Sequence, residues 1–295
     1  MSKTLFNPGH TACAGCGQAL AARLVVDTSG ANTIITNNTG CLEVFSTKYP
    51  ESSWGVPFIH SLFENAAAVA SGVEAALKYL GKKENINVIA QGGDGGTADI
   101  GLQALSGMWE RGHDILYVCY DNEAYMNTGI QRSGLTPFNS NTTTSPVGQL
   151  SLGNIRPKKP MPEIALAHGI PYVATASSGF PQDIQNKVKK ALSIKGPKYI
   201  QIHAVCPLGW RHETSVAIDI AKLAVETGLY PLIEYENGKL VSVRKIQPKP
   251  VQEYLKTQGR FKHLLYNPEE IKKIQALADH NIEKYNLRTE SPAGN

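Results

Sequence analysis

Residues 86–98 read INVIAQGGDGGTA and gather four glycines around one aspartate, directly after an apolar run. The apolar run is typical of a buried strand, and the spacing of apolar residues over 98–112 indicates a helix after it. Glycines at such a junction let the backbone come close to a bound group. The segment therefore predicts a strand, a tight turn and a helix arranged around a ligand.

Strand and helix signals alternate through the first two thirds of the chain. We expect strands at 33–40, 86–93, 114–122, 171–177 and 198–205, and helices at 18–30, 65–81, 98–112, 161–169 and 181–196. Apolar runs such as ILYVCY are continuous rather than alternating, as in strands buried on both faces of a parallel sheet. The pattern predicts an α/β fold, a doubly wound and mainly parallel sheet with helices on both faces.

Two segments depart from this alternation. Residues 122–160 are rich in Thr, Ser, Asn, Gly and Pro, and a loop of this length inside a compact domain is usually functional. After residue 228 we expect a hairpin, with its turn at 236–238, and two charged helices, the clearer of them at 267–287. We therefore predict a ligand-binding domain over 1–228 and an extension over 229–295, packed on the domain or on a partner subunit.

Composition excludes several classes of protein. The formal net charge is only +4 over 295 residues, without long blocks of one sign, which argues against nucleic acid or an anionic membrane as partner. The first residues show no export signal and no apolar run is long enough to span a bilayer, so we expect a cytoplasmic protein. Five cysteines, an odd number, favour metal or redox chemistry over disulfides in that compartment.

Three kinds of ligand compete for the glycine-rich junction. A nucleoside triphosphate loop needs a lysine that is absent here, whereas Gly93, Gly95 and Ala98 satisfy a dinucleotide fingerprint, which is weak by itself. The third ligand is a diphosphate held through a divalent cation by Asp94. Asn122 follows the GDG segment after 26 intervening residues, at the end of the next expected strand. Because Mg²⁺ needs several oxygen ligands, this pairing favours the third interpretation.

The cysteines suggest a second metal centre. Cys13 and Cys16 form a CxxC motif, while Cys41 and Cys206 each follow an expected strand, in loops. Cys119 lies inside the run ILYVCY, and we expect it to be a buried core residue. Four thiolates suit either a zinc ion or an iron–sulfur cluster, and the residues alone leave both open.

The GDG, 26-residue, Asn spacing resembles that of thiamine diphosphate enzymes. Together with GHTACAGCG, NTGCLEVFSTKYP, YDNEAYMNTGIQRSG and CPLGW, it resembles the β subunits of the 2-oxoacid:ferredoxin oxidoreductases, most nearly those acting on pyruvate. The resemblance covers about residues 9–212. It implies the diphosphate-type domain of the thiamine diphosphate-binding fold. The implied cofactors are thiamine diphosphate, Mg²⁺ and a 4Fe–4S cluster, with coenzyme A as co-substrate.

The resemblance also implies a role for each matching residue. Cluster ligands would be Cys13, Cys16, Cys41 and Cys206. The Mg²⁺ ligands would be Asp94 and Asn122 by their side chains and Ala124 by its carbonyl. Other cofactor contacts would be Gly40, Cys41, Glu64, Asn65, Gly93, Gly95, Gly96, Met126 and Asn127. Asn127 would act catalytically, facing the substrate carbon, whereas Glu64 and Asn65 have an alternative role in capping the helix that follows them.

The implied enzyme is a hetero-oligomer. Its partners would be an α-type chain carrying the pyrimidine half of the thiamine site, γ-type and ferredoxin-like δ-type chains, and ferredoxin as electron acceptor. Pyruvate is the expected substrate, with oxalate, 2-oxoglutarate, 2-oxoisovalerate and aryl pyruvates as alternatives. The competing hypotheses are a non-oxidative thiamine decarboxylase or synthase half with a structural zinc, an electron-transfer or scaffold module, and an NAD-dependent dehydrogenase.

Overall fold

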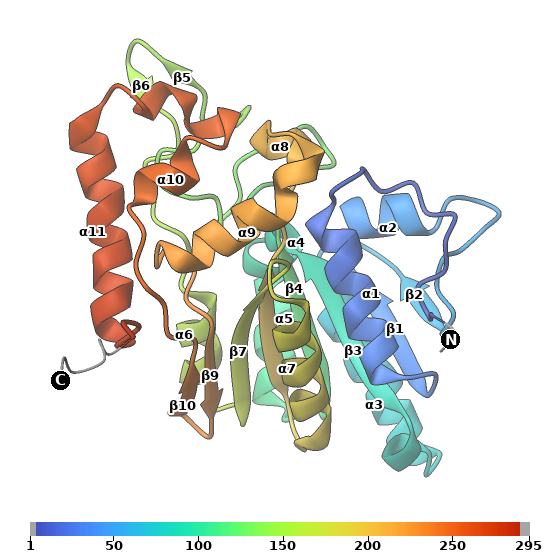
Figure 1. Ribbon diagram of the computed structural model, residues 1–295. Helices are drawn as coiled ribbons and strands as arrows, with labels where there is room; N and C mark the ends of the chain where they lie inside the picture. Colours follow the sequence, from blue (N-terminus) through green and yellow to red (C-terminus); the bar gives the residue numbers. More distant parts are fainter. Residues whose placement is uncertain (1–3, 290–295) are drawn as a thin grey trace.

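The computed structural model describes residues 4–289, and one central sheet dominates it (Figure 1). Within these residues the sheet has eight strands in the order β10-β9-β7-β8-β4-β3-β1-β2. Their bounds are β1 Thr33–Asn37, β2 Phe58–His60, β3 Asn87–Gly93, β4 Leu116–Asp121, β7 Tyr172–Ser177, β8 Lys198–His203, β9 Ile233–Glu236 and β10 Lys239–Val243. A separate two-stranded hairpin, β5 Val147–Gly148 and β6 Ser151–Leu152, lies within the long polar segment.

The strands from β2 to β7 across the sheet pair in parallel. At the centre, β4 pairs with β3, where Gly93 lies opposite Tyr120, and with β8, where Asp121 lies opposite His203. The predicted mainly parallel sheet is confirmed. Parallel pairing brings the carboxyl ends of β1, β3, β4 and β8 to the same edge, where ligands bind in open α/β sheets.

Helices cover both faces of the sheet, as expected. On one face, α1 (Gly17–Ser29) and α7 (Pro181–Ser193) pack against buried side chains of β1, β4 and β8. On the other face lie α3 (Ala66–Tyr79), α5 (Leu102–Glu110) and α6 (Met161–Ala167). The centre of the sheet is shielded from solvent on both faces: every residue of β4 is buried, including the charged Asp121 at its end.

The glycine-rich junction is tighter than the sequence predicts. A short helix, α4 (Asp94–Ala98), begins directly after β3, and α5 starts only at Leu102. A Cβ on Gly101 would lie 1.9 Å from the carbonyl oxygen of Gly96, so the chain turns back on itself between the two helices. The single helix expected over 98–112 is therefore wrong in its first turn. The sequence pattern also missed α2 (Cys41–Ser46) and β2, which are too short to show periodicity.

The C-terminal third builds a core of its own. Buried residues of its helices share one cluster beside the sheet. These elements are α8 Pro207–Trp210, α9 Ala217–Glu226, α10 Val251–Leu255, the 3-10 segment η3 Gly259–Leu264 and α11 Pro268–Lys284. Two further 3-10 turns are η1 Lys83–Asn85 and η2 Thr214–Val216. The expected hairpin and last helix are present.

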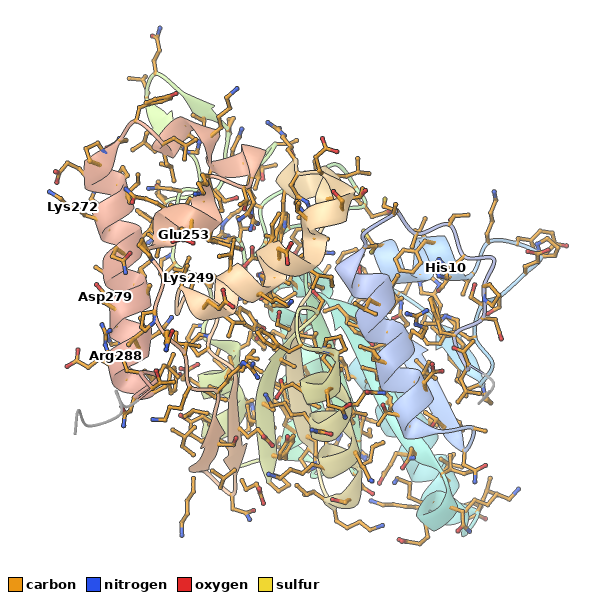
Figure 2. The ribbon with its side chains drawn as sticks, in the orientation of Figure 1. His10, Lys249, Glu253, Lys272, Asp279 and Arg288 are labelled. Carbon is orange, nitrogen blue, oxygen red and sulfur yellow. The ribbon has the colours of Figure 1, made fainter. Side chains whose placement is uncertain are left out.

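The hairpin is more than an appendage, because β9 pairs antiparallel with β7 and extends the main sheet. Along α11, Ile271, Ile274 and Ala278 face inward, while Lys272 and Asp279 project outward (Figure 2). This spacing is typical of a helix with one buried face. The domain boundary at residue 228 stays a prediction. Across residues 4–289, no helix combines the length and apolar character needed to cross a membrane.

Asp114 provides a test of what holds the amino-terminal edge of the sheet together. Its carboxylate accepts hydrogen bonds from Nζ of Lys83 (2.7 Å) and Nζ of Lys198 (2.5 Å). Burial acts to raise the pKa of Asp114, but the two ammonium groups outweigh it and lower the pKa to about 2.

We expect Asp114→Asn to lower the free energy of unfolding by about 1–2 kcal/mol at pH 7. Since a lowered carboxyl pKa stabilises the fold only while the group is ionised, the difference from wild type should shrink as pH falls from about 4 to 2. Urea unfolding at several pH values measures it. A difference that is constant with pH would contradict this role.

Candidate active site

The predicted magnesium ligands meet at the carboxyl edge of the sheet. Asp94 begins α4 after β3, while Asn122 and Ala124 follow β4. One terminal atom of the Asn122 side chain lies 2.8 Å from the Ala124 carbonyl oxygen and 2.8 Å from Oδ1 of Asp94. In the neighbouring β3 and β4, the pairing of Gly93 with Tyr120 sets this proximity.

The separation of these atoms matches a magnesium shell. With Mg–O distances of about 2.0–2.1 Å, neighbouring oxygens of an octahedron lie about 2.9 Å apart. Without a cation, the Asn122 amide would turn its nitrogen toward both oxygens and donate to them. With a cation, the oxygen faces them and Nδ2 donates to Oε1 of Gln18, 3.3 Å away. The residues present therefore fit a divalent cation.

The environment of Asp94 also favours a bound cation. Its side chain is 1% exposed, and Ser133 Oγ donates a short hydrogen bond to Oδ2. Burial raises the pKa of Asp94, and the nearby charge of Asp121 raises it further. A buried carboxylate is unstable without a counter-charge, so a cation at this position would restore its ionised form.

A cavity opens directly beside these ligands. It is lined by most of the predicted cofactor-binding residues: Gly40, Cys41, Gly93, Asp94, Gly95, Gly96, Asn122, Ala124, Met126 and Asn127. Gly93 offers backbone without obstruction, because a Cβ added there would meet no atom within 4 Å. Gly95 serves packing instead, since its Cβ would lie 2.3 Å from the Tyr125 ring.

The four selected cysteines converge on a second cavity, of about 460 Å³, lined by Cys13, Cys16, Cys41 and Cys206 among others. Gln18, Cys41, Asn122, Met126 and Asn127 line both cavities, so the two adjoin. Two of the thiol sulfurs accept backbone hydrogen bonds at 3.4 Å, at Cys16 from the Ala19 amide and at Cys206 from the Gly209 amide.

The local structure corrects where one of the cysteines lies. Cys41 is the first residue of α2 rather than part of a loop. Cys206 lies as expected in the loop after β8, at the N-cap position of α8. Burial raises the pKa of Cys41 to about 12 and that of Cys206 to about 11, and neighbouring thiols add to both shifts. Free thiolates are therefore disfavoured here, whereas a metal centre would stabilise them.

The last residue of β4 argues against a dinucleotide. Asp121 would have to bind ribose, but its side chain is fully buried and accepts hydrogen bonds from Lys158 Nζ (2.7 Å) and Gln201 Nε2 (2.8 Å). Cys119 is also fully buried, inside β4, which confirms the expectation that it belongs to the core.

Comparison with known proteins is decisive about the family. Residues 38–202 match the family model described as thiamine pyrophosphate enzyme, C-terminal TPP binding domain. The chain is 61% identical to the pyruvate synthase subunit PorB of Methanosarcina barkeri, over 97% of this chain and 98% of that protein. This chain belongs to the β subunits of the 2-oxoacid:ferredoxin oxidoreductases. It is thus a subunit of a thiamine diphosphate-dependent 2-oxoacid oxidoreductase.

Other relatives in this family agree. Identity is 58% to the PorB subunit of Methanocaldococcus jannaschii, covering 96% of each chain. It is 50% to the ketoisovalerate oxidoreductase subunit VorB of Pyrococcus abyssi, covering 92% of this chain and 88% of that one. A solved 2-oxoglutarate:ferredoxin oxidoreductase from Magnetococcus marinus shares the fold, with a TM-score of 0.58 and 22% identity over 92% of this chain and 94% of the other.

Two predicted contacts are not supported by the geometry of this β subunit. Glu64 lines a separate hollow with Gln103 and Arg111, and Asn65 lines neither cavity at the site. Asn65 is at the N-cap position of α3 but makes no capping hydrogen bond; its Oδ1 accepts from the Leu62 amide at 2.9 Å. Neither side chain lines the two cavities formed by this chain, and their contact with a cofactor stays a prediction.

Sequence reasoning missed Asn38, which takes the capping role and braces the glycine turn. Its Oδ1 accepts from the Ala66 amide (2.8 Å), and its Nδ2 donates to the Gly96 carbonyl (2.8 Å). Ser133, the donor to Asp94, was also missed. Both residues lie inside segments that carry the family resemblance, NTGCLEVFSTKYP and YDNEAYMNTGIQRSG, but neither segment indicates which distant groups these side chains contact.

Gly93 and Gly95 differ in the space that surrounds them, and this difference can be tested by replacing each with alanine. We expect Gly95→Ala to lower the free energy of unfolding by about 1–3 kcal/mol, because the added methyl overlaps the Tyr125 ring. Gly93→Ala is the matched control: φ is −72° there and the space is open, so its unfolding midpoint in urea should stay near wild type. Equal losses in both variants would contradict the packing difference.

Proposed function

We propose that this chain is the catalytic β subunit of a cytoplasmic pyruvate:ferredoxin oxidoreductase of the pyruvate synthase type. In the proposed reaction pyruvate loses carbon dioxide, its acyl group passes to coenzyme A, and two electrons leave singly for ferredoxin. One observation carries the proposal: the cysteine-lined cavity and the cavity beside Asp94 share walls, including Cys41 and Asn122. A carbanion centre and a one-electron acceptor would thus be neighbours.

In this proposal the cavity at the glycine turn holds thiamine diphosphate. Asp94, Asn122 and the Ala124 carbonyl are the Mg²⁺ ligands, and the turn around Gly93 lets the backbone approach the diphosphate. Thiamine diphosphate supplies the nucleophilic carbon and the electron sink for decarboxylation. Asn127 is exposed and lines both cavities, which suits a residue that orients the 2-oxo acid.

The second cavity holds a 4Fe–4S cluster in this proposal, ligated by Cys13, Cys16, Cys41 and Cys206. A structural zinc, the alternative, would need Zn–S distances of about 2.3 Å and hence sulfurs close together. Within residues 4–289, no three His, Cys, Asp or Glu side chains are grouped for a single metal ion. The proposed reaction favours a cluster over zinc, because a cluster can accept single electrons from the adjoining cavity and zinc has no redox chemistry.

The names of the related proteins support the assignment of the substrate. Those with the highest identities cited are pyruvate synthase subunits, at 61% and 58%, which supports pyruvate. The relative at 50% is named for ketoisovalerate, so the fold of this subunit is compatible with a branched 2-oxo acid as well. We infer that partner chains supply much of the pocket, together with the pyrimidine half of the thiamine site. A screen of 2-oxo acids with a viologen dye, using the assembled complex, tests this assignment.

Replacement of one cysteine tests the cluster. We expect Cys206→Ser in the anaerobically purified complex to lower the iron and acid-labile sulfide bound to this chain and to remove or alter its reduced-cluster EPR signal. Cys119→Ala is the control, because Cys119 is buried in β4 and lies in neither cavity. About one zinc and no iron in the wild-type chain would instead support the non-oxidative enzyme.

Replacement of the buried carboxylate tests the metal site. We expect Asp94→Asn to weaken thiamine diphosphate retention at least about tenfold at limiting Mg²⁺, since it removes the only charged ligand of the proposed set. Asp99→Asn serves as the control, because Asp99 pairs with Lys159 at 3.1 Å and does not line the cavity. Retention is measured by mass analysis of the complex after gel filtration. Equal retention in wild type and Asp94→Asn would contradict the assignment.

A further inference from the structure

Glu123 lies between Asn122 and Ala124, two of the three residues assigned to Mg²⁺, and has an unusual backbone. Its φ of +71° is in the left-handed region, which a residue with a side chain adopts only when its surroundings enforce it. Its side chain is 4% exposed and points away from the metal ligands into a buried cluster of charges. Whatever holds Glu123 therefore also sets the path of the chain between Asn122 and Ala124.

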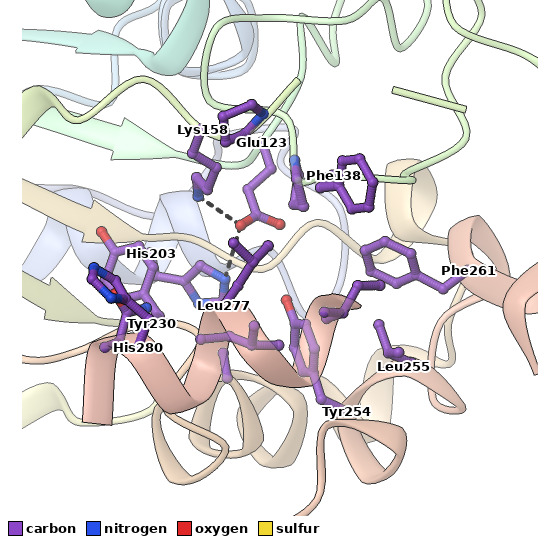
Figure 3. Close-up of a pocket in the computed structure, with 16 residues that line it drawn as sticks. Glu123, Phe138, Lys158, His203, Tyr230, Tyr254, Leu255, Phe261, Leu277 and His280 are labelled. Carbon is purple, nitrogen blue, oxygen red and sulfur yellow. Dashed lines mark hydrogen bonds and ion pairs between the residues drawn. The ribbon is translucent and has the colours of Figure 1, made fainter. Parts of the chain in front are cut away.

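Two cations hold the Glu123 carboxylate. Lys158 Nζ, from the long polar segment, lies 2.7 Å from Oε1, and Arg260 Nη2, from η3, lies 2.5 Å from Oε2. Figure 3 shows the carboxylate between Lys158 and His203, beside a cavity of about 190 Å³. Burial acts to raise the pKa of Glu123, but the two cations outweigh it and keep the pKa well below its usual range.

Lys158 forms ion pairs with two carboxylates, whereas Arg260 forms an ion pair with one. Lys158 Nζ also lies 2.7 Å from Oδ2 of Asp121. Among the described residues, the ion pairs of Arg260 involve Glu123 alone. The cluster of Asp121, Glu123, Lys158 and Arg260 is then balanced in charge. Loss of the guanidinium would leave one buried cation for two buried carboxylates, an arrangement that is strongly unfavourable.

Arg260 also contacts the segment that carries the fourth cysteine. Its guanidinium lies 3.8 Å from the ring centroid of Trp210, in the helix that begins directly after Cys206. The indole Nε1 of Trp210 donates to the carbonyl oxygen of Asn122 at 2.9 Å. The same side chain thus contacts the segment between the proposed Mg²⁺ ligands and the segment behind a proposed cluster ligand.

The position of Arg260 is itself fixed. Its side chain is 2% exposed, and its Nη2 also donates to the Tyr254 hydroxyl at 3.1 Å. The adjacent Gly259 amide donates to the Arg211 carbonyl at 3.1 Å, and a Cβ on Gly259 would lie 2.7 Å from Cβ of Arg211. Only glycine allows this approach, so η3 is held directly against the turn after α8.

We propose that Arg260 is a positioning residue that couples the metal-binding turn at 122–124 to the cysteine turn at 206–211. The inference rests on the proposed function. It also gives the C-terminal extension a role in that function, because Arg260, in η3, sets the geometry of both turns. Arginine suits this role because its planar guanidinium can stack on an indole while its edge donates to a carboxylate. Lysine, a point charge, cannot do both.

The test uses the assembled, anaerobically purified complex with Arg260→Met and Arg260→Lys. Two properties are measured: the apparent Kd for Mg²⁺, from thiamine diphosphate retention, and the EPR spectrum of the reduced cluster on this chain. Because outer partners of metal ligands affect metal affinity, we expect Arg260→Met to raise the Kd about 10- to 100-fold and to change the EPR line shape. Arg260→Lys should restore part of the Mg²⁺ affinity but not the wild-type EPR spectrum.

Three further variants separate coupling from general loss of stability. Arg244→Met removes another stacked arginine, 4.0 Å above the Phe180 ring and away from both turns, and Leu264→Ala opens a cavity in the buried core of η3. Both should leave the Kd and the EPR spectrum unchanged, even where Leu264→Ala lowers the melting temperature. Glu123→Gln should raise the Kd as Arg260→Met does, and the double variant should lose little more than either single one.

The outcomes are distinct. Suppose that the complex holds iron and thiamine diphosphate. If both Arg260 variants then show the wild-type Kd and EPR spectrum, the inference is overturned and the proposed function stays intact. Equal changes in Leu264→Ala would overturn it as well, because they would follow from stability alone. If Arg260→Met does not assemble, Arg260→Lys and Glu123→Gln decide. A wild-type complex without iron would instead refute the proposed function.

Discussion

The parallel pairing of β3 with β4 is the constraint on which the rest of the site depends. It places the residues after Gly93 beside those after Asp121, so that one terminal atom of the Asn122 side chain lies 2.8 Å from both Oδ1 of Asp94 and the Ala124 carbonyl oxygen. Antiparallel pairing would send these strand ends to opposite edges. The buried strands on either side keep the pairing rigid, because every residue of β4 packs inside the sheet.

The ionised forms of the carboxylate and thiols at the site are unfavourable in this chain alone, and the proposed cofactors would stabilise them. Asp94 is buried with a raised pKa, and the thiols of Cys41 and Cys206 have pKa values raised to about 12 and 11. Isolated charges are unfavourable in such surroundings, whereas the same groups bound to metal are stable. The arrangement is therefore understandable as two metal centres placed side by side, with Cys41 and Asn122 on their common wall.

The C-terminal extension belongs to this arrangement rather than lying beside it. Its hairpin extends the sheet through β7, and its helices share a buried core that reaches Trp210, behind the fourth cysteine. The contacts of Arg260 with Glu123 and Trp210 join that core to the turn carrying Asn122. A segment without any motif thus contacts the residues next to Asn122 and Cys206, although it lines neither cavity at the site.

The sequence by itself determined the parallel sheet, the glycine turn, the pairing of Asp94 with Asn122 and the choice of four cysteines from five. These follow from local rules: continuous apolar strands must be buried, and consecutive parallel strands end at one edge. Only the tertiary structure decided that Glu64 lines a separate hollow, that Asn38 and Ser133 bond to Gly96 and Asp94, and that Arg260 pairs with Glu123. Such contacts join residues from 39 to 137 positions apart, and hydrophobic periodicity does not encode which distant polar side chains meet.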